Sequence, residues 1–137
     1  MVRGTDQAVE LPSGRTVRGR RIGVPPASRP DWGLYLGLTR PAVDWPSAWI
    51  CWPDFGLPVL RREAWESIRT AWDMALEQRV EVACRGGIGR TGTALAAMCM
   101  LDGLTDREAI AWVRERYHAR AVETPWQATW LTRGPGR

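Results

Sequence analysis

Apolar side chains recur every three to four residues from Arg61 to Gln78, and this spacing predicts an amphipathic helix over that range. The apolar positions are Ala64, Trp65, Ile68, Ala71, Trp72, Ala75 and Leu76. Trp65 and Trp72 both fall on the apolar side. We therefore expect their indoles to pack in the core rather than to form a platform for a ligand.

Short apolar runs predict strands at residues 7–11, 15–18, 34–37, 48–52 and 79–83. The first two flank Pro12-Ser13-Gly14, which is typical of a hairpin turn. Strands and helices then alternate, which favours an α/β domain with a mostly parallel sheet flanked by helices. We expect a sheet of about four to five strands in a single domain. Residues 1–30 would form an N-terminal hairpin and loop, and residues 31–137 the core.

The C-terminal half carries clear helix signals. A small, apolar helix is expected from Thr91 to Asp102, ended by Gly103. The stretches Thr105–Glu108 and Thr124–Gln127 are capping boxes, each of which predicts the start of a further helix. His118, the single histidine, is expected in the last turn of the helix that follows Thr105, in a structural role.

The composition is that of an ordinary soluble domain. The 137 residues suffice for one core, and 45% of them are apolar and 25% charged. No apolar run approaches the length of a membrane span, and residues 1–10 lack the apolar core of a signal peptide. We expect a monomeric, cytoplasmic protein without a membrane span.

All 19 basic side chains are arginines, and the net charge of +4 favours anionic partners. The arginines are spread along the chain and no nucleic-acid-binding motif is present, so no nucleic acid partner is expected. The densest cluster is Arg15, Arg18, Arg20 and Arg21. We expect this cluster to be the solvated face of an edge strand, with attraction of phosphorylated substrates as the alternative.

The chain has three cysteines, Cys51, Cys84 and Cys99, and their spacing matches no zinc site. Free thiols in a reducing compartment are therefore expected. Cys99 falls among apolar residues of a predicted helix and is assigned to the core. Cys51 lies close to Asp54 in sequence, and a regulatory disulfide between Cys51 and Cys84 remains an alternative.

The stretch from Val80 to Thr93, V-E-V-A-C-R-G-G-I-G-R-T-G-T, suits a bound phosphate. A buried strand ends at Cys84 and a glycine-rich loop follows, so that successive backbone N–H groups can face one point. The next helix adds unpaired N–H groups and its positive dipole end. Arg90 offers a planar guanidinium for two phosphate oxygens. In this setting Cys84 would be a stabilised thiolate at the floor of a phosphate cradle.

These residues resemble the signature of the cysteine-dependent protein phosphatases of the tyrosine and dual-specificity type. That signature is Cys-x5-Arg-Ser/Thr, here Cys84 to Thr91. A second match, W-P-D-F-G-L-P at Trp52–Pro58, looks like the movable loop that carries the family's general acid. A weaker third match is Glu123–Gln127, where relatives carry glutamines. The acid loop precedes the cysteine here, unlike the order in low-molecular-weight tyrosine phosphatases.

The resemblance implies a hydrolase of phosphate monoesters that acts through a cysteinyl-phosphate intermediate. Protein phosphotyrosine is the expected substrate, with phosphoserine and phosphothreonine as further candidates. The implied catalytic residues are Cys84 as nucleophile, Asp54 as general acid and then base, Arg90 as phosphate clamp, Thr91 as donor to the sulfur, and Gln127. The implied phosphate-binding residues are Arg85, Gly86, Gly87, Ile88, Gly89 and Arg90.

Two of these assignments have competing interpretations. Gln127 either positions the attacking water or simply caps the last helix. Asp44, which also stands beside a Trp-Pro pair, is a decoy for the acid, because it precedes the predicted strand and Asp54 follows it. No metal or cofactor is expected, because Arg90 and the helix end supply the positive charge.

The chain departs from the family pattern at two positions. Ala83 stands where the family usually has histidine, and Glu123 stands where many members have the first of two glutamines. Neither change removes the nucleophile, the acid or the phosphate clamp, so we expect an active enzyme. The alternatives are a phosphoinositide or RNA 5′-phosphatase of the same fold, and a pseudophosphatase that binds phosphorylated partners without hydrolysing them.

Overall fold

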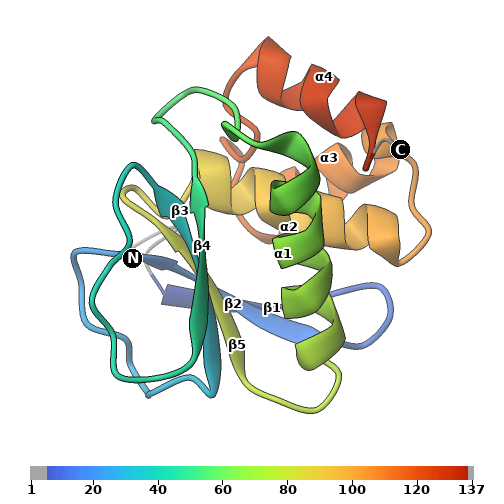
Figure 1. Cartoon of the computed structure of the whole chain (residues 1–137). Coiled ribbons are helices and arrows are strands. Elements are labelled where there is room, and N and C mark those ends of the chain that lie inside the picture. Colours follow the sequence, from blue (N-terminus) through green and yellow to red (C-terminus); the bar gives the residue numbers. More distant parts are fainter. Residues whose placement is uncertain (1–5, 136–137) are drawn as a thin grey trace.

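The computed structural model describes residues 6–135, so residues 1–5 and 136–137 of the predicted domain lie outside the described part. Within it, one five-stranded sheet has the strand order β1-β2-β5-β3-β4 (Figure 1). The strands are β1 (Asp6–Glu10), β2 (Thr16–Arg21), β3 (Trp32–Gly37), β4 (Ser47–Cys51) and β5 (Val80–Cys84). Neighbouring strands are parallel except β1 and β2, which form the antiparallel hairpin. The predicted α/β fold, with a mostly parallel sheet and an N-terminal hairpin, is confirmed.

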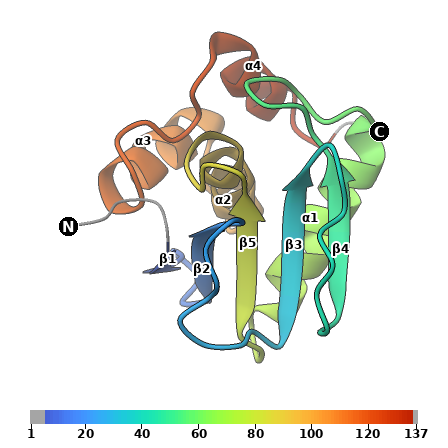
Figure 2. The same ribbon diagram turned by 90° about the vertical axis from the view of Figure 1, so that its left-hand side faces the viewer.

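The helices of the described part lie on one side of the sheet and stand behind it in Figure 2. They are α1 (Arg61–Met74), α2 (Gly89–Leu101), α3 (Asp106–Arg116) and α4 (Pro125–Arg133). α1 packs on β3 and β4, and α2 packs on β5 and β2. α3 and α4 pack on α2, which is therefore buried along most of its length. None of the described helices is long and apolar enough to span a membrane.

Most helix boundaries agree with the sequence signals, and both capping boxes form. α1 ends earlier than predicted, at Met74 instead of Gln78, because the chain turns there to enter β5. Leu76, which continues the apolar spacing, is consequently 64% exposed. His118 lies just beyond α3 rather than in its last turn, and its Nδ1 accepts a hydrogen bond from the Arg120 N–H.

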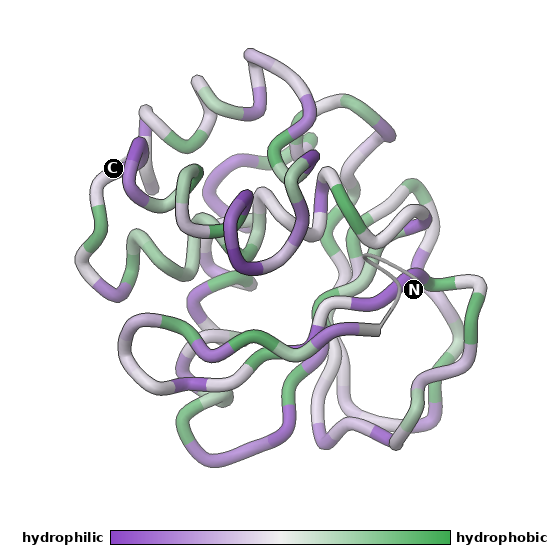
Figure 3. Tube along the Cα trace, turned by 180° about the vertical axis from the view of Figure 1, so that it is seen from behind, coloured by the Kyte–Doolittle hydropathy of each residue, from purple (hydrophilic) through white to green (hydrophobic). Residues whose placement is uncertain are grey.

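The core lies between the sheet and α1 and α2. Figure 3 shows hydrophobic and hydrophilic positions alternating along the chain, as expected for strands and helices with one buried side. Trp65 is buried as predicted and stacks on Trp130 of α4, with ring centroids 5.0 Å apart. Trp72 is only half-buried, because its indole N–H reaches out to the Asp102 carboxylate at 2.7 Å.

On the opposite side of the sheet the described residues form no helix, and the segments that join β2 to β3 and β3 to β4 cross it (Figure 2). The prediction that the arginine cluster of β2 lies on a solvated edge is wrong for Arg18 and Arg20. β1 takes the edge position, which places β2 inside the sheet. Arg20 is 4% exposed and Arg18 is half-buried, and both bind the buried Glu81 of β5.

Candidate active site

The phosphate loop, residues 84–90, connects β5 to α2. Cys84 ends the central strand β5 and is 1% exposed. Its Sγ accepts hydrogen bonds from the Gly87 N–H at 3.2 Å and from the Thr91 hydroxyl at 3.0 Å. Gly87 has φ +71°, a left-handed conformation that glycine adopts without strain. Two hydrogen-bond donors therefore converge on the sulfur.

The backbone N–H groups around this sulfur form an anion site. In the part of the chain that the structure describes, the N–H groups of Arg85, Gly86, Ile88 and Gly89 have no protein acceptor. α2 begins at Gly89, two residues earlier than predicted, so its positive dipole end is part of the loop itself. This combination of free amides and a helix start favours a bound phosphate group.

Tyr117 supports the phosphate loop from the far side, a role that the sequence did not indicate. Its hydroxyl donates to the Gly87 carbonyl oxygen. The ring reaches the loop across Gly19 of β2, where an added Cβ would lie 2.3 Å from the Tyr117 oxygen. Tyr117 is itself buried, and its ring is part of the hydrophobic core.

Arg90 joins the phosphate loop to the acid loop, residues 53–57. Its guanidinium is almost fully buried; Nη1 donates to the Trp52 carbonyl oxygen at 2.8 Å, and Nη2 lies 3.4 Å from Asp54 Oδ1. Asp54 has a side chain that is 56% exposed. The structure thus places the predicted phosphate clamp and the predicted acid in contact.

Three side-chain N–H groups hold the acid loop in place. The Trp52 and Trp126 indoles donate to the carbonyl oxygens of Gly56 and Phe55 at 2.8 and 2.6 Å. The Gln127 amide nitrogen also donates to the Gly56 carbonyl oxygen, at 3.2 Å. No sequence signal pointed to Trp126, which is 51% exposed.

The decoy Asp44 lies elsewhere. Its carboxylate binds Arg29 at 3.0 Å, and its side chain is 77% exposed. Asp44 belongs to the segment before β4, whereas Asp54 follows the carboxyl end of that strand. The geometry therefore favours Asp54 as the acid.

Gln127 is fully buried and its polar atoms are engaged by the protein. Its Oε1 accepts from the backbone N–H groups of Glu123 and Thr124, at 2.8 and 3.3 Å, which completes the capping box of α4. Its nitrogen binds the acid loop. These contacts fit a residue that positions the acid loop and caps the helix.

Glu123 lies between the two loops. Its carboxylate packs on Gly89, where an added Cβ would be 1.8 Å from Oε1. Partial burial and, secondarily, the charge of Asp54 raise the pKa of Glu123, while Arg120 and Arg90 oppose the shift. The Glu123 carboxylate is thus in electrostatic contact with Asp54 and Arg90.

The other two cysteines are remote from this chemistry. Leu36 of β3 is the register partner of both Cys84 and Ile50, so Cys51 lies two strands from Cys84 and on the opposite side of the sheet. Two strand spacings are about 10 Å, beyond the reach of a disulfide. Cys99 is fully buried in α2, as predicted, and burial raises its pKa to about 12.

A cleft of about 370 Å³ opens beside Arg90 and Asp54. Its lining is Ile22, Gly23, Leu36, Gly37, Leu38, Thr39, Asp54, Arg85 and Arg90. Apolar side chains of the segments after β2 and β3 face the charged groups of the two loops. Such a cleft can hold an apolar group attached to a phosphate. Among residues 6–135 no cluster of three or more potential metal ligands occurs.

Comparison with known proteins agrees with this geometry. The model of the protein-tyrosine phosphatase family matches residues 39–121. An uncharacterized protein of Methanocaldococcus jannaschii is 37% identical over 82 residues, which are 60% of this chain and 50% of that protein. The chain thus spans about half the length of this curated relative.

Two crystal structures of Tk-PTP are also similar. The active form has 28% sequence identity and a TM-score of 0.67, and the match covers 78% of this chain and 79% of that one. A glycine-to-alanine mutant form has 26% identity and a TM-score of 0.74, with 96% and 94% covered.

Proposed function

The chain belongs to the protein-tyrosine phosphatase family, and we propose that it hydrolyses phosphate monoesters, above all phosphotyrosine in proteins, through a phosphorylated Cys84. One observation carries the proposal. Cys84 Sγ receives two hydrogen bonds at the floor of a loop of free amides, and the Arg90 of that loop contacts the exposed carboxyl group of Asp54.

The reaction would proceed in two displacements. In the first, the Cys84 sulfur forms a bond to phosphorus, the ester P–O bond breaks, and Asp54 gives its proton to the leaving oxygen. The loop amides and Arg90 hold the equatorial phosphate oxygens as charge develops on them. In the second, a water oxygen attacks phosphorus, the S–P bond breaks, and Asp54 takes the water proton. The Thr91 hydroxyl bond stabilises the departing thiolate.

The cleft supports an aromatic leaving group. The walls at Ile22, Leu36 and Leu38 are apolar, which suits a phenyl ring better than the short chain of phosphoserine. Arg85, whose side chain also lines the cleft, can pair with acidic residues of a protein substrate. We therefore place phosphotyrosine first and phosphoserine and phosphothreonine after it.

A panel of phosphotyrosine, phosphoserine and phosphoinositide substrates tests this proposal, with Cys84→Ser as the inactive control. We expect the highest kcat/KM for phosphotyrosine peptides. Equal values for phosphoserine would contradict the aryl preference, and a preference for phosphoinositide would assign the cleft to lipid headgroups. A pseudophosphatase would bind phosphate yet release no phenol from phenyl phosphate.

A further inference from the structure

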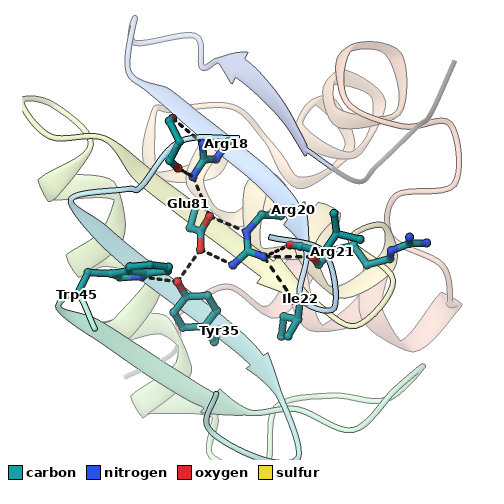
Figure 4. A network of polar contacts seen from close by, with 9 residues as sticks. Arg18, Arg20, Arg21, Ile22, Tyr35, Trp45 and Glu81 are labelled. Carbon is teal, nitrogen blue, oxygen red and sulfur yellow. Dashed lines mark hydrogen bonds and ion pairs between the residues drawn. The ribbon is translucent and has the colours of Figure 1, made fainter. Parts of the chain in front are cut away.

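Glu81 is the centre of a buried polar network on the helix-free side of the sheet (Figure 4). It lies in β5, three residues before the nucleophile, and is fully buried. Its carboxylate accepts two hydrogen bonds from Arg20, through Nε and Nη2 at 2.8 Å each. Arg18 and the Tyr35 hydroxyl donate to it as well, at 3.0 and 2.5 Å. Every oxygen of this carboxylate is therefore engaged by donors from β2 and β3.

Stability alone does not account for such a network. Removing a carboxylate from water is costly, and a buried ion pair is often no more stabilising than apolar residues of similar volume. What the network does supply is fixed geometry, because the fork of Arg20 matches the Glu81 carboxylate in only one orientation. Hydrogen bonding to Glu81 accordingly raises the pKa of Arg20, and the same bonds lower the pKa of Glu81 against the effect of burial.

Through Arg20, the network reaches the wall of the cleft that Ile22 and Gly23 form. The remaining nitrogen of Arg20, Nη1, donates to the carbonyl oxygens of Arg21, Ile22 and Val24. The Ile22 N–H in turn donates to the Cys84 carbonyl oxygen at 2.9 Å. The segment that carries Ile22 and Gly23 is thus held between the Arg20 guanidinium and the backbone of the nucleophile.

A second arm of the network runs away from the cleft, toward the amino ends of β3 and β4, because the Tyr35 hydroxyl lies beside Gly33. The Tyr35 hydroxyl, which donates to Glu81, accepts a hydrogen bond from the Trp45 indole at 2.6 Å. Trp45 precedes β4, whose first residue pairs with Gly33, so this arm lies at the end of β3 opposite to Leu38 and Thr39 of the cleft. Figure 4 shows Arg20 and Tyr35 approaching Glu81 from the two neighbouring strands. Glu81 therefore links the cleft wall at Ile22 and Gly23, and the residues that precede β4, to the strand that carries Cys84.

We infer that Glu81, with Arg20 and Tyr35, is a positioning unit that fixes the cleft wall at Ile22 and Gly23 and thereby sets the affinity for the organic part of the substrate. The inference rests on the proposed function, because the organic group is taken to be the leaving group of the hydrolysed ester. Its test measures binding alone and does not require hydrolysis. The phosphate group is held by the loop amides and Arg90, none of which contacts the Glu81 carboxylate. Variants that disrupt the network should therefore lower the affinity for the organic group and leave the affinity for phosphate almost unchanged.

The test compares the dissociation constants of inorganic phosphate and benzylphosphonate, a non-hydrolysable aryl ligand, by calorimetry. The double variant Arg20→Met with Glu81→Leu replaces the ion pair by apolar side chains and is expected to fold. It should bind benzylphosphonate about tenfold more weakly and phosphate with about the wild-type affinity. Tyr35→Phe removes only one hydroxyl. It should weaken benzylphosphonate binding by about threefold and leave phosphate binding unchanged. Arg62→Gln, which breaks the exposed pair with Glu66, is the control and should change neither constant.

The dissociation constants of phosphate and benzylphosphonate distinguish a failure of the inference from a failure of the proposed function. Equal weakening of both ligands would overturn the inference, because the network would then only support the fold or the phosphate loop. Unchanged binding of both ligands by Tyr35→Phe and by the double variant would overturn it as well. A wild-type protein that binds both ligands but hydrolyses no ester contradicts the proposed function and leaves the selectivity test intact. A wild-type protein that binds neither contradicts the phosphate site, and the inference with it.

Discussion

The two loops that meet at Arg90 are held in opposite ways. The phosphate loop is fixed by the main chain: the buried strand β5 leads into it and α2 begins within it, so that Cys84 and Arg90 are almost fully buried. The acid loop projects into solvent, with Phe55 53% exposed and at φ +57°. It is held mainly by single side-chain bonds, two of them from the start of α4.

This difference separates two parts of the chemistry. The phosphate loop presents its amides before any substrate arrives, so its contribution should apply to every phosphate ester. In the proposed mechanism the acid loop contributes a proton, so its contribution should grow with the basicity of the leaving oxygen. A loop held by a few side-chain bonds can also open and close at little cost, as a lid over substrate must. Variants in the two loops should therefore fail in different ways.

The largest effect is expected for Asp54→Ala. Without a proton donor, hydrolysis of phenyl phosphate or a phosphotyrosine peptide should fall by about 10²–10⁴-fold. An aryl phosphate with a nitro- or fluoro-substituted, weakly basic leaving group should be slowed much less. Steady-state kinetics over a series of leaving groups measures this difference.

Asp44→Ala is the matched control, because Asp44 is exposed and its carboxylate pairs with the exposed Arg29. It should show wild-type dependence on the leaving group. An equal loss for good and poor leaving groups in Asp54→Ala, or leaving-group dependence in Asp44→Ala, would show that the acid loop has been assigned wrongly.

Arg90→Lys probes the phosphate loop. An ammonium group cannot hold two phosphate oxygens and also reach the Trp52 carbonyl oxygen, as the guanidinium does. We expect turnover to drop by roughly 10²–10³-fold, to the same extent for good and poor leaving groups. Wild-type kcat in a variant shown to be folded by circular dichroism would exclude this role.

Trp126→Phe should loosen the acid loop without touching the phosphate loop. The variant loses the indole bond to the Phe55 carbonyl oxygen, worth about 1 kcal/mol. We expect kcat for phenyl phosphate to fall by about fivefold, while phosphate inhibits as in the wild type. Trp112→Phe in α3 is the matched control. A change in phosphate inhibition with unchanged kcat would show that Trp126 supports the phosphate loop instead of the acid loop.

The smallest effect concerns Glu123, which lies between the loops. Its pKa is raised in the folded protein, so the unfolded chain loses this proton first as the pH rises. The associated stability is present below the unfolded pKa, near pH 4, and is lost as the pH rises through the folded pKa. Glu123→Gln should therefore melt at a higher temperature than the wild type at neutral pH, and the advantage should shrink in acid. A difference in melting temperature independent of pH would contradict the raised pKa of Glu123.

The phosphate loop could be predicted from sequence because its determinants are local. The strand, the glycines, the arginine and the helix follow one another between Val80 and Leu101, and their order fixes their geometry. Asp54 could be separated from Asp44 for the same reason, since position relative to one strand decides between them. The capping boxes at Thr105 and Thr124 are likewise local.

The features that the sequence did not reveal depend on distant contacts. Glu81 stands as one charge among valines in a short strand, and its partners Arg20 and Tyr35 are 61 and 46 residues away. Trp126 meets the acid loop across 71 residues. The arginine cluster was assigned to a solvated edge because the sequence pattern of a strand does not reveal its position in the sheet. Once β1 occupies the edge, the buried Arg20 and the half-buried Arg18 become partners of Glu81.

The most direct test of the central claim is a rapid-quench experiment with phenyl phosphate, followed by mass mapping of the protein. If Cys84 attacks phosphorus and water then frees the phosphate, a burst of phenol should precede steady turnover. Phosphate should then be found on the peptide that contains Cys84. Cys84→Ser should show neither, while Cys51→Ser should behave as the wild type. Phenol release without phosphorylated Cys84 at any quench time, or phosphate attached to another residue, would contradict the account.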